Sequence, residues 1–108
     1  MKQLTAIKTL SALAHDGRLT LMRHLIKSGP EGIRAGDLAL LAQIQATTAT
    51  AQLLILSNAG LIGSRRTGRY VIYFPKFEHF RDLMSFLLND CCANRKDMCC
   101  DLGQETKS

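Results

Sequence analysis

The segment at residues 45–61, QATTATAQLLILSNAGL, constrains the fold of this chain more than any other part of its sequence. Leu53, Ile55 and Leu56 lie at helical spacing, which predicts an amphipathic helix with one face buried against neighbouring helices. Gly60 is expected just beyond the end of that helix, because glycine adopts the left-handed conformation without the steric cost of a Cβ. A short strand is expected to follow at residues 61–64.

The sequence before this segment predicts three more helices. Apolar residues at helical spacing indicate a first helix over residues 3–14 with one apolar seam, and a second helix over residues 18–27. Asp16 is placed to cap the second helix, and the turn cluster SGPEG at residues 28–32 ends it. A third helix is expected over residues 37–43, so a tight turn separates it from the fourth and the two form a helix-turn-helix.

The sequence after this segment predicts a hairpin and a last helix. Residues 69–74 are β-branched and aromatic, and Thr67-Gly68 supplies the turn that pairs them with residues 61–66. Apolar residues at helical spacing then predict a fifth helix from about Lys76 to Asn89. The order of elements predicts a mainly α fold with a β-hairpin wing, which is a winged helix-turn-helix.

Length and composition favour one domain that dimerises. A chain of 108 residues with 46% hydrophobic residues builds a single small core, and small cores are marginal on their own. We therefore expect a homodimer formed through the first and last helices. We expect residues 1–90 to form the DNA-binding and dimerisation domain, and residues 91–108 to form a cysteine-containing effector tail that is partly disordered.

The same composition excludes several classes of protein. No apolar run approaches the ~18 residues of a membrane span, and residues 1–10 lack the apolar block of a signal peptide. We therefore expect a cytoplasmic protein with no membrane partner. The net charge of +5 suits a polyanionic partner such as double-stranded DNA. No nucleophile–base pair, phosphate-binding loop or carboxylate pair stands out, so we expect neither an enzyme nor an organic cofactor.

Candidate base contacts lie in the first half of the fourth helix. Thr47, Thr48, Thr50 and Gln52 fall where a major-groove helix presents short donors and acceptors. Hydroxyls also satisfy backbone N–H groups at helix starts, so one of Thr47 or Thr48 is expected to cap the helix instead. Gln52 has no such structural role in the sequence, and a glutamine reads adenine bidentately.

Candidate phosphate contacts lie on the hairpin, at Arg65, Arg66 and Arg69. Alone, these arginines indicate a solvated strand edge whose charge prevents edge-to-edge pairing. Beside a helix-turn-helix, they are expected to hold phosphates or to enter a narrow minor groove. Arg18 is expected to tie the first two helices together at their junction.

All four cysteines lie in one window of ten residues, as Cys91, Cys92, Cys99 and Cys100. A disulfide-stapled secreted fold would spread its cysteines along the chain, whereas clustered thiols indicate metal binding or redox sensing. We expect As(III) or Sb(III) as the effector ligand, because these soft centres take three thiolates.

Two other uses of the cysteines stay open. The next alternative is a thiol switch that responds to oxidants or persulfides. Zinc or cadmium bound by four thiolates ranks third, because adjacent cysteines suit a tetrahedral site poorly. A thiol-dependent arsenate reductase and a DNA-binding protein without an effector are competing classes.

Four motifs, taken in order, resemble the ArsR (ArsR/SmtB) family of winged-helix repressors. They are ALAHDGRL at residues 12–19, GDLA at 36–39, TTATAQL through AGL at 47–61, and RRTGRYVIY at 65–73. The resemblance implies a dimeric transcriptional repressor that binds operator DNA. Gln52 stands where members usually carry histidine, and the third helix lacks the cysteine pair of many metal sensors.

The C-terminal cysteines resemble those of an arsenite-responsive subset of this family, which carries a vicinal pair just after the last helix. The resemblance implies that Cys91 and Cys92 are two ligands of As(III) and that the third is Cys99 or Cys100. It also implies that the repressor dissociates from its operator when the metalloid binds. His15, His24 and His79 are expected to be structural or surface residues.

Overall fold

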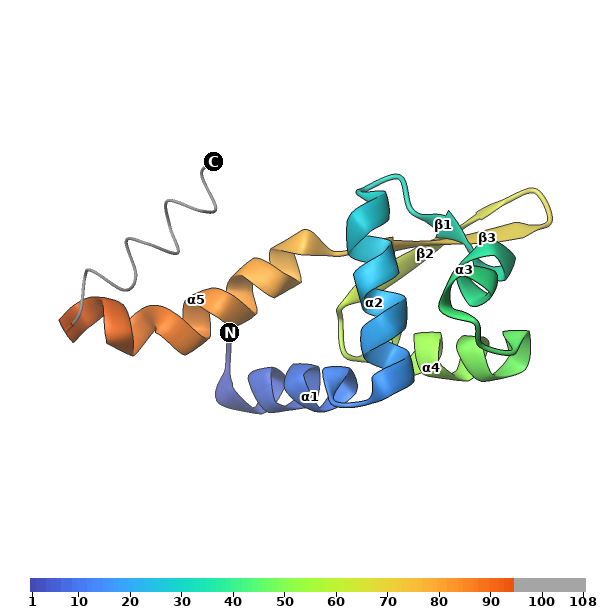
Figure 1. The fold of residues 1–108 in the computed structure, drawn as a ribbon. Helices are drawn as coiled ribbons and strands as arrows, with labels where there is room; N and C mark the ends of the chain where they lie inside the picture. The colour runs from blue at the N-terminus through green and yellow to red at the C-terminus, as the bar shows by residue number, and fades with distance from the viewer. Residues whose placement is uncertain (95–108) are drawn as a thin grey trace.

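The computed structural model describes the backbone of residues 1–94 and the side chains of residues 1–88. In this part of the chain, five helices and three short strands form a mainly α winged helix-turn-helix, as the sequence predicts (Figure 1). The elements are α1 (Gln3–Leu13), α2 (Asp16–Ser28), β1 (Ile33–Arg34), α3 (Ala35–Ala42), α4 (Ala46–Asn58), β2 (Ile62–Thr67), β3 (Tyr70–Pro75) and α5 (Phe77–Asn94).

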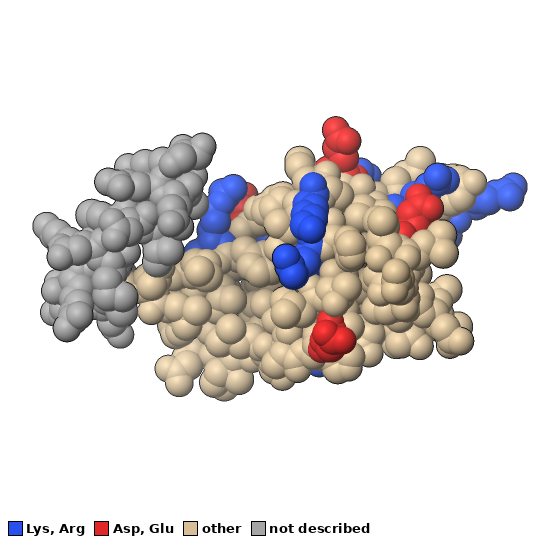
Figure 2. Space-filling model, viewed as in Figure 1, with Lys and Arg blue, Asp and Glu red and all other residues tan. Residues whose placement is uncertain are grey.

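The sheet is antiparallel, with strand order β1-β3-β2. Its β2–β3 hairpin pairs from Ile62 opposite Pro75 to Thr67 opposite Tyr70, and it projects from the helical body as the predicted wing (Figure 1). Basic side chains gather at the far end of this hairpin (Figure 2). The two-residue strand β1 was not predicted, because only its pairing with β3 defines it.

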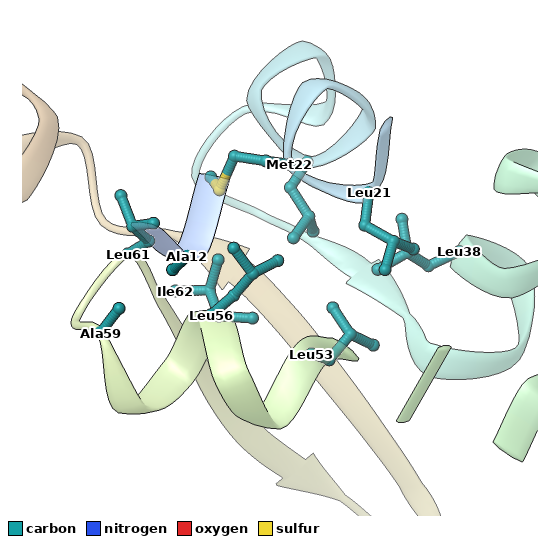
Figure 3. Packing of buried hydrophobic residues seen from close by; sticks show 10 residues of the cluster. Ala12, Leu21, Met22, Leu38, Leu53, Leu56, Ala59, Leu61 and Ile62 are labelled. Atoms are coloured by element: carbon teal, nitrogen blue, oxygen red, sulfur yellow. The ribbon is translucent and has the colours of Figure 1, made fainter. Parts of the chain in front are cut away.

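The core lies where α2 crosses α4 and the start of β2 (Figure 3). Its buried side chains include Leu21, Met22, Leu25, Leu38, Leu53, Leu56, Leu61 and Ile62. Within the described residues, no single helix is long and apolar enough to cross a membrane; α3 and α4 pass that test only as a pair bent by 104°.

The apolar seam of α1 lies on the surface of the single chain. The residues that α1 buries are small, namely Ala6, Thr9 and Ala12. Leu4 and Ile7 are 81% and 53% exposed, so the large side chains of the seam face away from this core. Small residues on the inner face let α1 approach the body closely, and the larger ones remain available for a second contact.

Two predicted helix starts differ from the structure. His15, not Asp16, caps α2, because its Nδ1 accepts hydrogen bonds from the N–H groups of Gly17 (3.1 Å) and Arg18 (3.4 Å). Asp16 is the first residue of α2, where its charge suits the positive end of the helix dipole. The N-cap residue of α4 is Gln45, and no side chain caps this helix. The expectation that Thr47 or Thr48 caps α4 is therefore wrong.

The predicted end of α4 is confirmed. Gly60 has a φ of +85° and follows the last helical turn. Its N–H donates to the Ser57 carbonyl (3.0 Å), and the Leu61 N–H donates to the Leu56 carbonyl (3.1 Å), which is the hydrogen-bond pattern of a Schellman motif. The buried contact between Leu56 and Leu61 fixes the direction in which the chain enters the wing.

Helix α5 runs further than the sequence analysis placed it. It continues past Asn89 to Asn94, the last residue that the structure describes, because the intervening residues contain no proline or glycine that would stop a helix. The predicted boundary between residues 90 and 91 therefore falls inside α5, and the backbone of Cys91 and Cys92 is helical. The rest of the predicted tail lies outside the described residues.

Candidate nucleic-acid interface

The helix-turn-helix is formed by α3, α4 and the three residues between them. The chain bends by 104° between α3 and α4, which lies within the range of about 90–120° for this motif. Gln43 makes the turn with a φ of 57°, and the Ile44 N–H donates to the Ala39 carbonyl (3.0 Å). This geometry confirms the predicted tight turn and leaves one face of α4 on the surface.

The outward face of α4 is neutral. Ala49, Leu53 and Leu56 are its buried residues. The exposed positions in its first half are Ala46, Thr47, Thr48, Thr50 and Ala51, followed by Leu54. The three threonines predicted as base contacts are therefore accessible to a partner. No Lys, Arg, Asp or Glu occurs anywhere in α4.

Gln52 differs from the threonines in being half-buried and bound. The Arg18 Nη1 donates to the Gln52 Oε1 over 2.8 Å, and the Arg18 Nε donates to the Ala12 carbonyl over 2.6 Å. Arg18 thus joins the α1–α2 junction to α4, which confirms its predicted structural role. Bidentate adenine reading needs both the oxygen and the nitrogen of the carboxamide, so Gln52 would either share its oxygen between Arg18 and the base or leave Arg18.

The three predicted wing arginines are all exposed, but their surroundings differ. The Arg65 Nη2 donates to the Glu31 carbonyl (2.6 Å), and its guanidinium lies 5.3 Å from the centroid of the Phe74 ring. Arg65 therefore fastens the wing to the turn after α2. Within the described residues, Arg66 and Arg69 form no hydrogen bond or ion pair, so their guanidinium groups are free for phosphate oxygens.

A fourth arginine lies beside the wing and was missed by the sequence analysis. Arg34 pairs with Ile72 across the sheet, on the opposite side of that residue from Arg65. Its guanidinium lies 4.6 Å from the Tyr70 ring centroid, and its Nε lies 3.4 Å from the Asp37 carboxylate. Only knowledge of β1 would have placed Arg34 here, and a two-residue strand leaves no signal in the sequence.

The predicted effector site lies mostly beyond what the structure describes. Cys91 and Cys92 belong to the last part of α5, and Cys99 and Cys100 lie outside the described residues. Within the described residues, no three His, Cys, Asp or Glu side chains are grouped to hold a metal ion. His79 of α5 has a structural contact, because its Nε2 lies 2.8 Å from the Thr9 hydroxyl of α1.

Comparisons with known proteins agree with this geometry. No protein-family model matches the chain. The HTH-type transcriptional regulator YgaV of Escherichia coli (strain K12) is 30% identical over 87 residues, which cover 81% of this chain and 86% of YgaV.

Solved structures show the same fold. An ArsR-like transcriptional regulator from Rhodococcus sp. RHA1 superposes with a TM-score of 0.71 at 19% identity, covering 94% of this chain and 92% of that chain. A homodimeric winged helix-turn-helix DNA-binding domain from Mycobacterium bovis, a possible ArsR-family regulator, superposes with a TM-score of 0.66 at 22% identity, covering 82% and 81%.

These relatives are transcriptional regulators rather than enzymes, in agreement with the class predicted from the sequence. The ordered motifs, the helix-turn-helix with its wing and the similarity to YgaV lead to one conclusion. The chain belongs to the ArsR family of winged helix-turn-helix transcriptional regulators.

Proposed function

We propose that this chain is a homodimeric repressor that binds operator double-stranded DNA and leaves it when As(III) or Sb(III) binds its C-terminal thiolates. The observation that carries the proposal is the composition of α5. This helix exposes two large apolar residues, Met84 and Leu87, and carries Cys91 and Cys92 one turn further on. A ligand held there would act directly on the helix that joins the two subunits.

Exposed apolar side chains on α1 and α5 support the dimer. Leu4, Ile7 and Leu10 of α1 are 43–81% exposed, and Met84 and Leu87 of α5 are 48% and 46% exposed. Full burial of a large aliphatic side chain contributes about 1.5–3 kcal/mol. A second copy of the chain that covers this surface would supply the stability that a small core lacks.

The surface of α4 and the wing supports DNA as the partner. In a symmetric dimer, two α4 helices would enter successive major grooves of a pseudo-palindromic site. Arg66 and Arg69 of each subunit would lie near the phosphate backbone and add affinity that does not depend on sequence. The cost of releasing these contacts falls as salt rises, so binding would weaken steeply with ionic strength.

The chemistry of the cysteines supports a trivalent metalloid as the effector. As(III) is soft and takes three thiolates in a pyramid, with its lone pair in the fourth direction. Cys91 and Cys92 lie one helical turn beyond Leu87 in α5, and the third thiolate would come from Cys99 or Cys100. Binding would release DNA if the liganded dimer favours the state with low DNA affinity, and couplings of this kind are typically about 1–3 kcal/mol.

Fluorescence anisotropy tests the proposal on a labelled duplex from the chain's own upstream region. The reduced protein is titrated with arsenite and, in separate experiments, with zinc and with an oxidant. We expect release by arsenite at near-stoichiometric concentration, and loss of that release in Cys91→Ser. Release by the oxidant alone would instead establish the thiol switch, and release by zinc alone the divalent-metal alternative.

The third thiolate has its own matched pair of variants, Cys99→Ser and Cys100→Ser. One of the two should abolish the arsenite response while the other preserves it.

Sedimentation at micromolar concentration tests the dimer separately. A monomer under those conditions would contradict the proposed assembly.

A further inference from the structure

We propose that α4 recognises A·T base pairs through apolar contacts with the C5-methyl groups of thymine. This inference rests on the proposed binding of operator DNA and names what the helix reads there. The major groove is the side of the duplex on which the thymine methyl is displayed. Thymine methyls are therefore the chemical feature that the exposed face of α4 would contact.

The centre of that face is apolar apart from hydroxyl groups. Thr47, Ala51 and Leu54 follow one another at spacings of four and three residues, so they share one side of the helix. All three are exposed, and Leu54 is 60% exposed in the single chain. Thr48 and Thr50 flank this stripe, and each adds a further methyl group.

Few of the polar side chains that usually read bases in the major groove occur on α4. Guanine is read by arginine or lysine, and α4 contains neither. Adenine is read by asparagine or glutamine; within α4 the Gln52 oxygen already accepts from Arg18 at 2.8 Å, and the exposed Gln45 precedes the first residue of the helix. Asn58 is the last residue of α4, whereas base contacts in this motif come from the N-terminal part of the recognition helix.

The threonine hydroxyls do not supply the discrimination either. The Thr50 hydroxyl already donates to the Ala46 carbonyl at 2.9 Å, so its outward group is the methyl. The hydroxyls of Thr47 and Thr48 can bond to several bases, because a hydroxyl both donates and accepts. What remains to distinguish one base pair from another is contact between methyl groups.

The wing explains why such a face would meet DNA rather than an apolar protein partner. Arg66 and Arg69 form no ion pair within the described residues, and they provide charge complementary to a phosphate backbone. The view in Figure 2 shows basic side chains at the end of the hairpin and mostly uncharged surface over α4. Charge for affinity and methyl groups for selection would then lie on separate elements of one interface.

The test compares thymine with uracil, which differ only in the methyl group. The purified full chain selects a duplex from a random-sequence pool, and each thymine of that duplex is replaced in turn by deoxyuridine. We expect binding about fourfold weaker for each contacted methyl removed, and no change at thymines outside the two half-sites. Replacing a contacted thymine by 5-methylcytosine should retain more affinity than replacing it by cytosine.

A pair of variants separates the methyl from the hydroxyl of one side chain. Thr47→Ser removes the methyl and keeps the hydroxyl, and Thr47→Val does the reverse. We expect Thr47→Ser to weaken binding about fourfold and to lose the penalty for uracil at one thymine, while Thr47→Val stays within twofold of the wild type. Thr20→Ser is the matched control, because Thr20 lies on α2 and its hydroxyl donates to the Asp16 carbonyl.

Two results would overturn the inference. One is equal binding with uracil in place of every thymine; the other is weaker binding for Thr47→Val together with unchanged binding for Thr47→Ser. In both cases, salt-dependent binding to the selected duplex would leave the proposed DNA-binding function intact. If the chain enriches no duplex from the pool, the proposed function fails, and this inference fails with it.

Discussion

Along the first half of α4 the exposed side chains are threonines and alanines, followed by Leu54, whereas the β2–β3 hairpin exposes three arginines. A neutral helix gains little affinity from the charge of DNA but responds to the shape and methyl pattern of the groove. A charged hairpin binds any phosphate backbone and discriminates weakly. In the proposed DNA complex, selection and affinity would therefore lie on separate elements, and each could be altered while the other is preserved. The expected changes in folding stability are largest for the residues that support α4 and smallest for the residues that are exposed on the wing.

The largest change is expected for Leu53→Ala, which removes a fully buried side chain beneath the outward face of α4. The loss of packing and the cavity left behind should lower the free energy of unfolding by about 2–5 kcal/mol, measured by denaturant titration. Leu54→Ala is the matched control, because that neighbour is 60% exposed and should change stability by less than about 0.5 kcal/mol. Equal destabilisation by the two variants would contradict the orientation of α4.

The next change concerns the contact that holds the middle of α4 to the α1–α2 junction. Arg18→Met removes the hydrogen bonds to the Ala12 carbonyl and the Gln52 carboxamide. Hydrogen bonds of a charged group contribute about 1.5–3 kcal/mol, so unfolding should become easier by an amount in that range. Arg23→Met on the exposed side of α2 is the control and should stay within about 0.5 kcal/mol of the wild type.

A smaller change is expected at the joint between α4 and the wing. Gly60→Ala places a Cβ at a residue with φ +85° and 3.1 Å from the His79 ring, which should cost about 1–2 kcal/mol of stability in thermal or denaturant unfolding. Gly36→Ala provides the contrast, since a Cβ added to this glycine of α3 would meet no heavy atom within 4 Å. That substitution should be neutral or stabilising by up to about 1 kcal/mol. Similar destabilisation by both would disprove the left-handed joint.

The smallest change in stability, below about 0.5 kcal/mol, is expected for the double variant Arg66→Ala with Arg69→Ala. Its effect should appear in DNA binding, where the dependence of log affinity on log salt becomes shallower by about 1 for each phosphate that is no longer bound. Arg65→Ala is the control, because the Arg65 guanidinium is held by the Glu31 carbonyl and should contribute less to that slope. An unchanged slope in the double variant would show that Arg66 and Arg69 of the wing do not bind phosphates, which contradicts the proposed interface.

The features that the sequence predicts well are local. The spacing of Leu53 and Leu56 and the Ala-Gly pair before Leu61 are enough to place α4 and its end, because helix periodicity and glycine conformation act over a few residues. The Thr-Gly turn of the wing follows from the same kind of rule, and its Gly68 has a φ of +62°.

The features that sequence reasoning missed depend on distant partners or on close competitors. The Arg18–Gln52 and Arg65–Glu31 contacts each join residues 34 apart, a separation at which no pattern in one sequence identifies a pair. At the start of α2, His15 and Asp16 are both able to cap, and only the backbone conformation shows which one does. Only the structure therefore shows which of the predicted DNA-binding side chains already bond to other residues of the chain and which are free.

Counting reactive thiols tests the metalloid claim most directly. The reduced protein is saturated with arsenite, and the thiols that still react with a colorimetric disulfide reagent are measured per chain and compared with the arsenite-free protein, which has four. Three thiolates on one As(III) would leave a single reactive thiol per chain, and this is the expected result. Four reactive thiols after arsenite, together with DNA binding that arsenite does not change, would contradict it.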